Sequence, residues 1–149
     1  MAAFDFSATT TEIALTAATA KTVLQIVAAA NHRVRGKGWG VFFDGTSTTA
    51  EPVQVRLLRQ TTAGTMSALT LTKRDDSIAD TLLTTAQHTA TAEPTAGDVL
   101  EVVEVHPQQS YEKWWPMGSE IIIGGGDRLG VECTAPAGVN VRAVFYGEE

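Results

Sequence analysis

The sequence of 149 residues is poor in cysteine and contains no long apolar run. Its single cysteine, Cys133, excludes an internal disulfide framework and a zinc site built from several cysteines. No apolar run approaches the length of about 18 residues that a membrane-spanning helix needs, so we expect no contact with a membrane. Residues 1–6 lack a basic region followed by a long apolar one, and we therefore expect no secretory signal.

Charge is also scarce, and it is mostly negative. Charged residues make up 19% of the chain, and 11 Lys and Arg stand against 17 Asp and Glu, for a net charge of −6. An acidic balance without a basic face counts against nucleic acid as a partner. Since 44% of the residues are hydrophobic, the composition also excludes a disordered chain, which combines low hydrophobicity with high charge.

Motifs of known enzyme classes are missing. The chain has no nucleophile elbow, no zinc-protease helix motif, no phosphate-binding loop and no acidic calcium loop. Residues 124–126 are three glycines between two expected strands, and without a following helix they indicate a turn rather than a nucleotide cradle. We expect no cofactor and no catalytic residues.

Two kinds of enzyme site remain as alternatives, a histidine metal site and a pair of carboxylates. His32, His88 and His106 are the residues that a metal-dependent cupin-like enzyme would use, but such enzymes place two histidines close together on one strand. A glycosidase would pair two carboxylates, and nothing in the spacing of the glutamates singles out a pair. The sequence therefore predicts neither a metal site nor a catalytic pair.

Small and β-branched residues are abundant in this weakly charged chain. The chain has 21 Thr, 21 Ala, 14 Val and 13 Gly. A helical bundle would instead be rich in Leu, Glu, Lys and Arg. Threonine and valine favour strands, so this composition predicts an all-β domain.

Alternating apolar and polar residues predict short strands along most of the chain. The expected strands cover residues 12–16, 22–29, 39–43, 53–59, 99–105, 111–115, 120–123, 128–133 and 139–146. Residues 22–29 are apolar on both faces, which is typical of a strand covered on both sides. An Ala-rich helix over residues 17–30 is the alternative there, although β-branched residues disfavour it.

Turn residues separate these strands at regular intervals. Residues 31–38 indicate a turn, and residues 124–127 predict a hairpin between the strands on either side. Residues 60–98 are the least distinct stretch, with one or two short strands expected near 69–71 and 83–91. The total of about eight to ten strands predicts an antiparallel jelly-roll sandwich, with residues 12–149 as one domain and Cys133 buried in its core.

Aromatic side chains give the first candidates for an interface. Trp39, Tyr111, Trp114 and Trp115 are four of the ten aromatic residues. Within a strand, Trp114 and Trp115 must point to opposite faces, so one ring enters the core and the other needs a cover. A neighbouring subunit would supply that cover, since Trp and Tyr often anchor interfaces. A strand bend or a covering loop would do the same.

Two further segments are candidates for binding a partner. Arg33 and Arg35 lie in the one basic cluster of an acidic chain and suit an acidic surface, although an ordinary solvated loop has the same composition. Residues 1–11 carry Phe4 and Phe6 in polar surroundings, which is the pattern of an anchoring arm, of a frayed terminus or of a first edge strand.

Several segments together resemble the head decoration, or capsid cement, proteins of tailed bacteriophages. The resemblance covers roughly residues 20–146 and lies in residues 36–45 (GKGWGVFFDG), 55–61 (VRLLRQT), 92–95 (AEPT), 126–130 (GDRLG) and 133–136 (CTAP). It implies a tumour necrosis factor-like jelly roll that assembles as a homotrimer. It also implies a structural virion protein that binds the major capsid protein on the outer surface of the head and is present in the host cytoplasm during assembly.

A second functional hypothesis comes from the aromatic residues. Exposed Trp39, Tyr111 or Trp114 would stack on sugar rings in a carbohydrate- or receptor-binding jelly roll of a phage tail fibre or surface assembly. The two hypotheses differ in the partner that they require, which is a capsid for the first and a glycan or receptor for the second.

Overall fold

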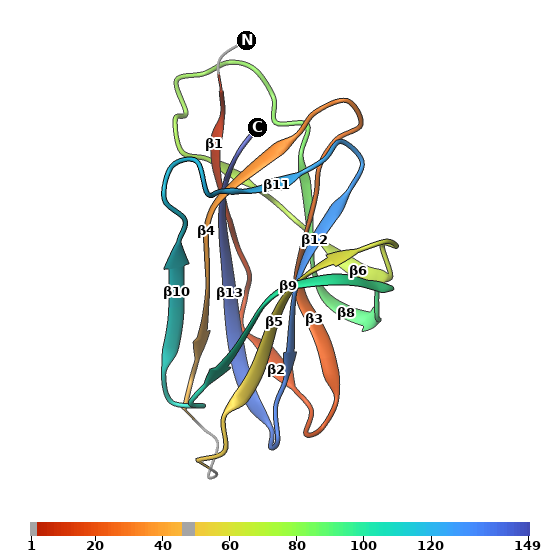
Figure 1. Cartoon of the computed structure of the whole chain (residues 1–149), viewed down its shortest axis with the longest axis vertical. Coiled ribbons are helices and arrows are strands. Elements are labelled where there is room, and N and C mark those ends of the chain that lie inside the picture. Colours follow the sequence, from red (N-terminus) through yellow and green to blue (C-terminus); the bar gives the residue numbers. More distant parts are fainter. Residues whose placement is uncertain (1–2, 46–49) are drawn as a thin grey trace.

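The computed structural model describes residues 3–45 and 50–149, and the regular structure in these residues is entirely β. Thirteen strands form two antiparallel sheets that face each other, as Figure 1 shows. The predicted all-β, antiparallel class is confirmed. The described residues hold more strands than the eight to ten expected, because residues 60–98 contribute three and residues 5–9 form a strand of their own.

Sheet A contains the N-terminal and C-terminal strands. Its order is β10-β4-β13-β1-β7, with β11 also paired to β4 and β2 to β13. The strands are β1 (Asp5–Thr9), β2 (Ile13–Leu15), β4 (Val34–Phe43), β7 (Thr72–Lys73), β10 (Ser110–Trp114), β11 (Ile121–Ile123) and β13 (Val139–Glu148). The last strand of the chain therefore lies in the middle of the sheet, between β4 on one side and β1 and β2 on the other.

Sheet B contains the remaining strands in the order β6-β8-β3-β12-β5-β9. They are β3 (Ala20–Val27), β5 (Val53–Gln60), β6 (Thr65–Leu69), β8 (Thr85–Ala92), β9 (Ala96–Val105) and β12 (Arg128–Thr134). The helix considered for residues 17–30 does not form. Five consecutive residues of β3, 22–26, are buried, so the prediction of a strand covered on both faces is confirmed.

The core lies between the sheets and is built by the alternation read in the sequence. Val53, Val55 and Leu57 of β5 are fully buried, and Cys133 of β12 is buried opposite Val55, as expected. Desolvation in this position raises the pKa of the Cys133 thiol far above its usual value, so the group stays neutral. Trp39 of β4 is the largest fully buried side chain.

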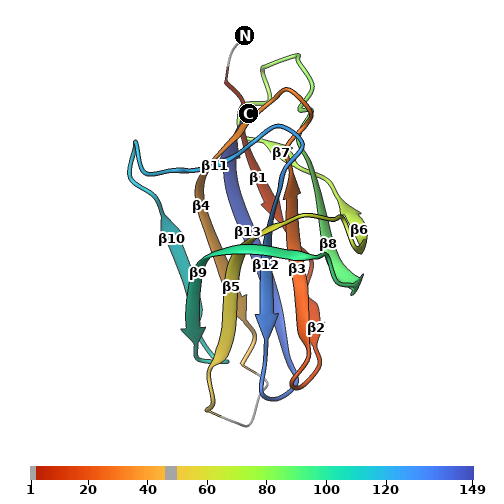
Figure 2. The same ribbon diagram turned by 45° about the vertical axis from the view of Figure 1, so that its right-hand side comes forward.

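A polar cluster covers the outer face of β3. Glu93, in the turn after β8, accepts hydrogen bonds from the backbone N–H (2.9 Å) and hydroxyl (2.6 Å) of Thr22. The buried Gln60 side chain bonds both Gln25 (2.7 Å) and Thr22 (2.9 Å). Figure 2 shows the first part of β9 crossing in front of the sheet. These bonds give the buried Thr22 hydroxyl and the buried Gln25 Nε2, on the outer face of β3, hydrogen-bond partners.

Two local predictions were wrong. Residues 34–38 belong to strand β4 rather than to a turn, because their glycines lie where neighbouring strands and rings approach too closely for a side chain. The hairpin at residues 124–127 does not form either, since β11 pairs with β4 in sheet A and β12 with β3 and β5 in sheet B. The turn passes from one sheet to the other and is held by bonds between Ala28 and both Gly126 and Asp127.

Candidate interaction surfaces

The two phenylalanines of the N-terminal segment are part of the core. Phe4 is 3% exposed and Phe6 is 0% exposed, and the Phe6 ring lies 6.4 Å from that of Phe145. Residues 5–9 form β1 between β13 and β7, while Met1 and Ala2 fall outside the described residues. The expectation that Phe4 and Phe6 bind a capsid is therefore corrected, because neither ring is accessible in this fold.

The basic cluster is partly neutralised within the chain. Lys37 lies 2.6 Å from Asp5 and 2.7 Å from Glu148, and Arg35 lies 3.9 Å from Glu148. The hydrogen bonds from Lys37 to Asp5 and Glu148 raise the pKa of its ammonium group. Arg33 is exposed and has no ion-pair partner in the described part of the chain, so it is the arginine of this pair that remains available to an acidic partner.

The four candidate aromatic residues divide between the core and the surface. Trp39 is fully buried, with the Tyr111 ring 5.5 Å away, so the expectation that Trp39 contacts a second subunit or a sugar is corrected. The predicted split of the adjacent tryptophans is confirmed. Trp115 is half-buried against the core, whereas Trp114 is 49% exposed on the other side of its strand.

Glu101 joins two of these aromatic side chains, and Lys113, across the gap between the sheets. It lies on β9 of sheet B, and its carboxylate accepts three hydrogen bonds. The donors are Lys113 Nζ of β10 (2.7 Å), Trp115 Nε1 just after β10 (3.0 Å) and Trp39 Nε1 of β4 (3.3 Å). The side chain is 17% exposed. This contact closes the β9–β10 side of the sandwich and makes Trp39 and Trp115 structural.

An aromatic pair forms the most exposed ring system on sheet A. Trp114 and Tyr146 stack at a ring distance of 4.6 Å and an angle of 15°, and the Arg74 guanidinium lies 5.5 Å from the centre of the Tyr146 ring. Trp114 lies over Gly38, where an added Cβ would come within 2.9 Å of its ring. The missing side chain on β4 therefore allows the tryptophan to reach Tyr146.

The edge strand β9 carries the main exposed aliphatic group. Val99, Leu100 and Val102 are 43%, 38% and 52% exposed. Strand β9 pairs only with β5, so its other edge presents unpaired backbone groups beside these side chains. An exposed apolar edge strand is a surface on which another chain can pack or add a strand.

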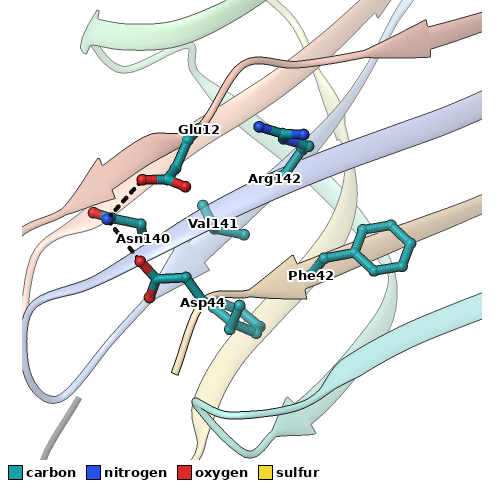
Figure 3. A pocket seen from close by; sticks show the side chains of 7 residues that line it. Glu12, Phe42, Asp44, Asn140, Val141 and Arg142 are labelled. Atoms are coloured by element: carbon teal, nitrogen blue, oxygen red, sulfur yellow. Dashed lines mark hydrogen bonds between the residues drawn. The ribbon is translucent and has the colours of Figure 1, made fainter. Parts of the chain in front are cut away.

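A shallow polar cleft of about 360 Å³ lies at one end of sheet A, and Figure 3 shows its residues. Asn140 Nδ2 donates hydrogen bonds to Glu12 Oε1 (2.9 Å) and to Asp44 Oδ2 (2.8 Å), so the amide bridges the two carboxylates. Arg142 and Phe42 also line this cleft. The carboxylates are thus held by an amide rather than arranged around an ion.

The three histidines lie apart from one another. His32 is in the loop before β4, His88 is in β8, and His106 follows β9 and accepts a hydrogen bond from the backbone of Gln108. Within residues 3–45 and 50–149 no group of three or more His, Cys, Asp or Glu side chains could hold a metal ion. Among the same residues, no helix is long and apolar enough to cross a membrane.

Comparisons with known proteins add no identity to this geometry. No family model, no curated protein and no solved structure matches the chain. The structure alone therefore describes the chain. It is an antiparallel β-sandwich with an exposed apolar edge strand and an aromatic pair on its surface.

Several residues of these surfaces were missed by the sequence analysis. Glu101 was considered only as one of several glutamates, and Tyr146 and Arg74 were not considered for the aromatic surface. The pairing of Trp114 with Tyr146 joins β10 to β13 across β4, which no local pattern encodes. The apolar residues on either side of Glu101 were visible, but alternation alone does not distinguish an edge strand from a central one.

Proposed function

We propose that this chain is a head decoration protein of a tailed bacteriophage. It assembles as a homotrimeric jelly roll, binds the major capsid protein on the outer surface of the head and stabilises the shell without catalysis. The resemblance in residues 36–45 and the other matching segments suggested this role, and the exposed edge strand β9 is the structural observation that carries it.

The strand order supports the jelly-roll part of the proposal. Strands β1, β13, β4 and β10 are neighbours in sheet A, and β3, β12, β5 and β9 are neighbours in sheet B. The chain moves from β3 to β4 to β5, and later from β11 to β12 to β13, changing sheet at each step. Such crossing between two facing sheets is what two Greek keys in a jelly roll require.

The β9 surface supports self-association. Val99, Leu100 and Val102 lie together on a strand whose outer edge is unpaired, and exposed edges of this kind are usually covered or blocked. The edge of sheet B formed by β9 differs from the edge formed by β6. If β9 of one copy contacts an unlike surface of the next copy, the same contact can repeat until the copies close into a ring. A trimer would bury β9 in this way.

Analytical ultracentrifugation tests the trimer. We expect a particle with three times the mass of the chain, and we expect Val102→Lys to shift it toward the monomer. Thr91→Lys, at an exposed position of β8, is the matched control and should remain trimeric. A strictly monomeric wild-type protein would exclude the assembly that the proposal requires.

Co-sedimentation with expanded phage capsids tests the partner. Arg33 is exposed, so Arg33→Glu should weaken capsid binding if this region meets an acidic surface. Arg142→Glu, on an exposed arginine of β13, is the charge-matched control. Wild-type protein that shows no affinity for capsids would refute the decoration role. Deleting residues 1–11 would be a poor test, since it removes β1 from sheet A.

The exposed aromatic pair favours one alternative function, a carbohydrate-binding module of a tail fibre or surface assembly. Trp114 has half of its surface exposed and is held flat against Tyr146. A glycan array should then give a signal that Trp114→Ala abolishes and that Met117→Ala, at a residue 94% exposed, does not. Absence of any glycan signal would leave the decoration role as the proposal.

A further inference from the structure

A cleft of about 460 Å³ lies at the end of β5, beside the start of β9. Arg59 and Gln60 from the end of β5 line it together with Arg128 from the start of β12. Ile122 of β11 and the turn before β12 form the opposite side. The cleft is therefore built by strands of both sheets and not by a single loop.

The two arginines are close neighbours in the ladder of sheet B. Arg128 pairs with Gln60 and Leu129 pairs with Arg59, so the arginines lie one register step apart on adjacent strands and their Cβ atoms leave opposite faces of sheet B. Both are half-buried. The cleft lies at the end of this ladder, where both arginines line it, in a chain that has only 11 Lys and Arg and carries a net charge of −6.

Neither arginine has an ion-pair partner among the described residues. Arg35, Lys37, Arg56 and Lys113 each lie within 4.0 Å of a carboxylate, but Arg59 and Arg128 do not. Arg128 Nε is buried without an acceptor in the same part of the chain. A buried guanidinium nitrogen without an acceptor is costly, and such groups mark places where another acceptor is expected.

The other polar groups of the cleft are already engaged or turned aside. The Gln60 amide is used by Gln25 and Thr22, as described above. Asp127 also lines the cleft, but its Oδ2 lies beside Gly124, where it would be 2.7 Å from an added Cβ, and it makes no ion pair with either arginine. The cleft thus combines two uncompensated positive charges with one carboxylate that points to its own turn.

We propose that this cleft binds an oxyanion, of the phosphate or carboxylate type, between Arg59 and Arg128. Guanidinium groups suit such ligands because their planar N–H donors match two oxygen atoms at once. Because both arginines are half-buried, solvent screens their charges less than it screens the charge of the exposed Arg33. The site does not depend on the proposed decoration role.

Arginine side-chain NMR during ligand titration tests the site. Inorganic phosphate and acetate are titrated separately into the full chain at low chloride, and the N–H signals of Arg59 and Arg128 are followed. A saturable shift with phosphate assigns a phosphoryl-type ligand, and one with acetate assigns a carboxylate. Absence of a saturable shift with both anions would overturn the proposal.

Variants establish which residues hold the anion. Arg59→Gln and Arg128→Gln should each weaken binding about tenfold or more, since each removes a charge-assisted donor pair. Asp127→Asn should tighten it severalfold by removing the one negative charge of the cleft. Arg142→Gln, far from the cleft in the sheet A ladder, should leave the affinity unchanged. An equal loss in Arg142→Gln and Arg128→Gln would overturn the site as non-specific charge attraction.

Discussion

Glu101 shows what a single carboxylate contributes when it lies between two sheets. It accepts hydrogen bonds from two indole N–H groups and one ammonium group, and its own strand is at the edge of sheet B. Edge strands have only one neighbour, so β9 depends on such contacts more than a central strand does. The pKa of Lys113 is raised by this hydrogen bond with Glu101, which keeps the cation charged.

Glu101→Ala should lower the free energy of unfolding by about 2–4 kcal/mol, because it leaves buried donors of Trp39 and Trp115 without an acceptor. Urea denaturation followed by tryptophan fluorescence measures the change. Glu112→Ala is the matched control, since Glu112 also accepts from an indole, that of Trp114 at 2.9 Å, but is exposed. Its loss should cost less than about 1 kcal/mol. Equal costs for the two variants would contradict the role given to Glu101.

The burial of some candidate residues could not be predicted from the sequence. Phe4 and Phe6 are spaced by two in polar surroundings, and the same pattern serves a free arm and a strand that buries both rings. Trp114 and Trp115 were predictable, because neighbouring residues of a strand face opposite sides whatever the partners are. The burial of Trp39 depends on Tyr111 and Glu101, which lie more than sixty positions away in the chain.

At the scale of the elements, glycine determines how β10 lies on β4. Gly38 pairs with Trp114, and an added Cβ would lie 2.9 Å from both the Lys113 carbonyl oxygen and the Trp114 ring. The carbonyl belongs to the β10 backbone and cannot turn away as a side chain can. The close approach of the two strands, and with it the stacking of Trp114 on Tyr146, thus requires a residue without a side chain.

Gly38→Ala should therefore destabilise the protein by about 1–3 kcal/mol and weaken the near-ultraviolet circular dichroism signal of the stacked Trp114 and Tyr146. Urea denaturation and circular dichroism of the same samples measure both effects. Gly138→Ala is the control, because its added Cβ would meet only the Leu15 carbonyl at 3.7 Å. An unchanged signal in Gly38→Ala would show that β10 does not need this glycine.

The segment between β7 and β8 is held at both ends by charged side chains. Lys73 donates to the carbonyl oxygens of Ile78 (2.5 Å) and Asp80 (3.0 Å). The Glu149 carboxylate accepts from the backbone N–H groups of Leu83 and Thr84 and from the Thr84 hydroxyl. Burial tends to raise the pKa of Glu149, but these hydrogen bonds outweigh it and the net pKa is lowered.

Because the folded pKa of Glu149 lies below its ordinary value of 4.5, its contribution to stability is present above that value and is lost as the pH falls through the folded pKa. Denaturation midpoints measured from neutral pH down to the acid range should fall less steeply in Glu149→Gln than in the wild type. Hydrogen exchange at Leu83 and Thr84 should quicken in the variant. Asp98→Asn, at an exposed carboxylate, should keep the wild-type slope. A wild-type slope in Glu149→Gln would contradict this anchoring.

The elements themselves were predictable where side chains alternate strongly. Strands β5, β9 and β13 stand close to their expected ranges, because valine and leucine recur at every second position. Strands β6, β7 and β8 were less distinct, since threonine, alanine and serine differ little between the two faces. The partners of β11 and β12 could not be predicted, because the turn between them is held by Ala28, the residue after β3 and about a hundred positions earlier in the chain.

At the scale of the whole molecule, both ends of the described chain meet in sheet A. The backbone N–H of Phe4 donates to the Glu149 carbonyl and that of Glu149 donates to the Phe4 carbonyl, each at 2.9 Å. Figure 1 shows the two ends at the same end of the sandwich. The surface assigned to assembly, the exposed edge of β9, lies on another strand than these paired ends.

A circular permutant tests this closure. Residue 149 joined to residue 1 by a linker of about five glycine and serine residues, with new ends between Met117 and Gly118, should keep the fold, since Met117 is 94% exposed. New ends between Val141 and Arg142 should abolish it, because they divide the central strand β13. Far-ultraviolet circular dichroism and urea denaturation compare the two. Equal stability of both permutants would contradict the central role of β13.

The position of β13 also bears on the order in which the chain matures on the ribosome. Strands β1, β2 and β4 are translated early, yet all three pair with β13, which is translated after every other described strand. Until β13 leaves the exit tunnel, the inner side of β4, with its large tryptophan, has no finished sheet around it. The nascent polypeptide must therefore expose the apolar face of an incomplete sheet A until β13 is available. We expect chaperone contact to concentrate in that interval.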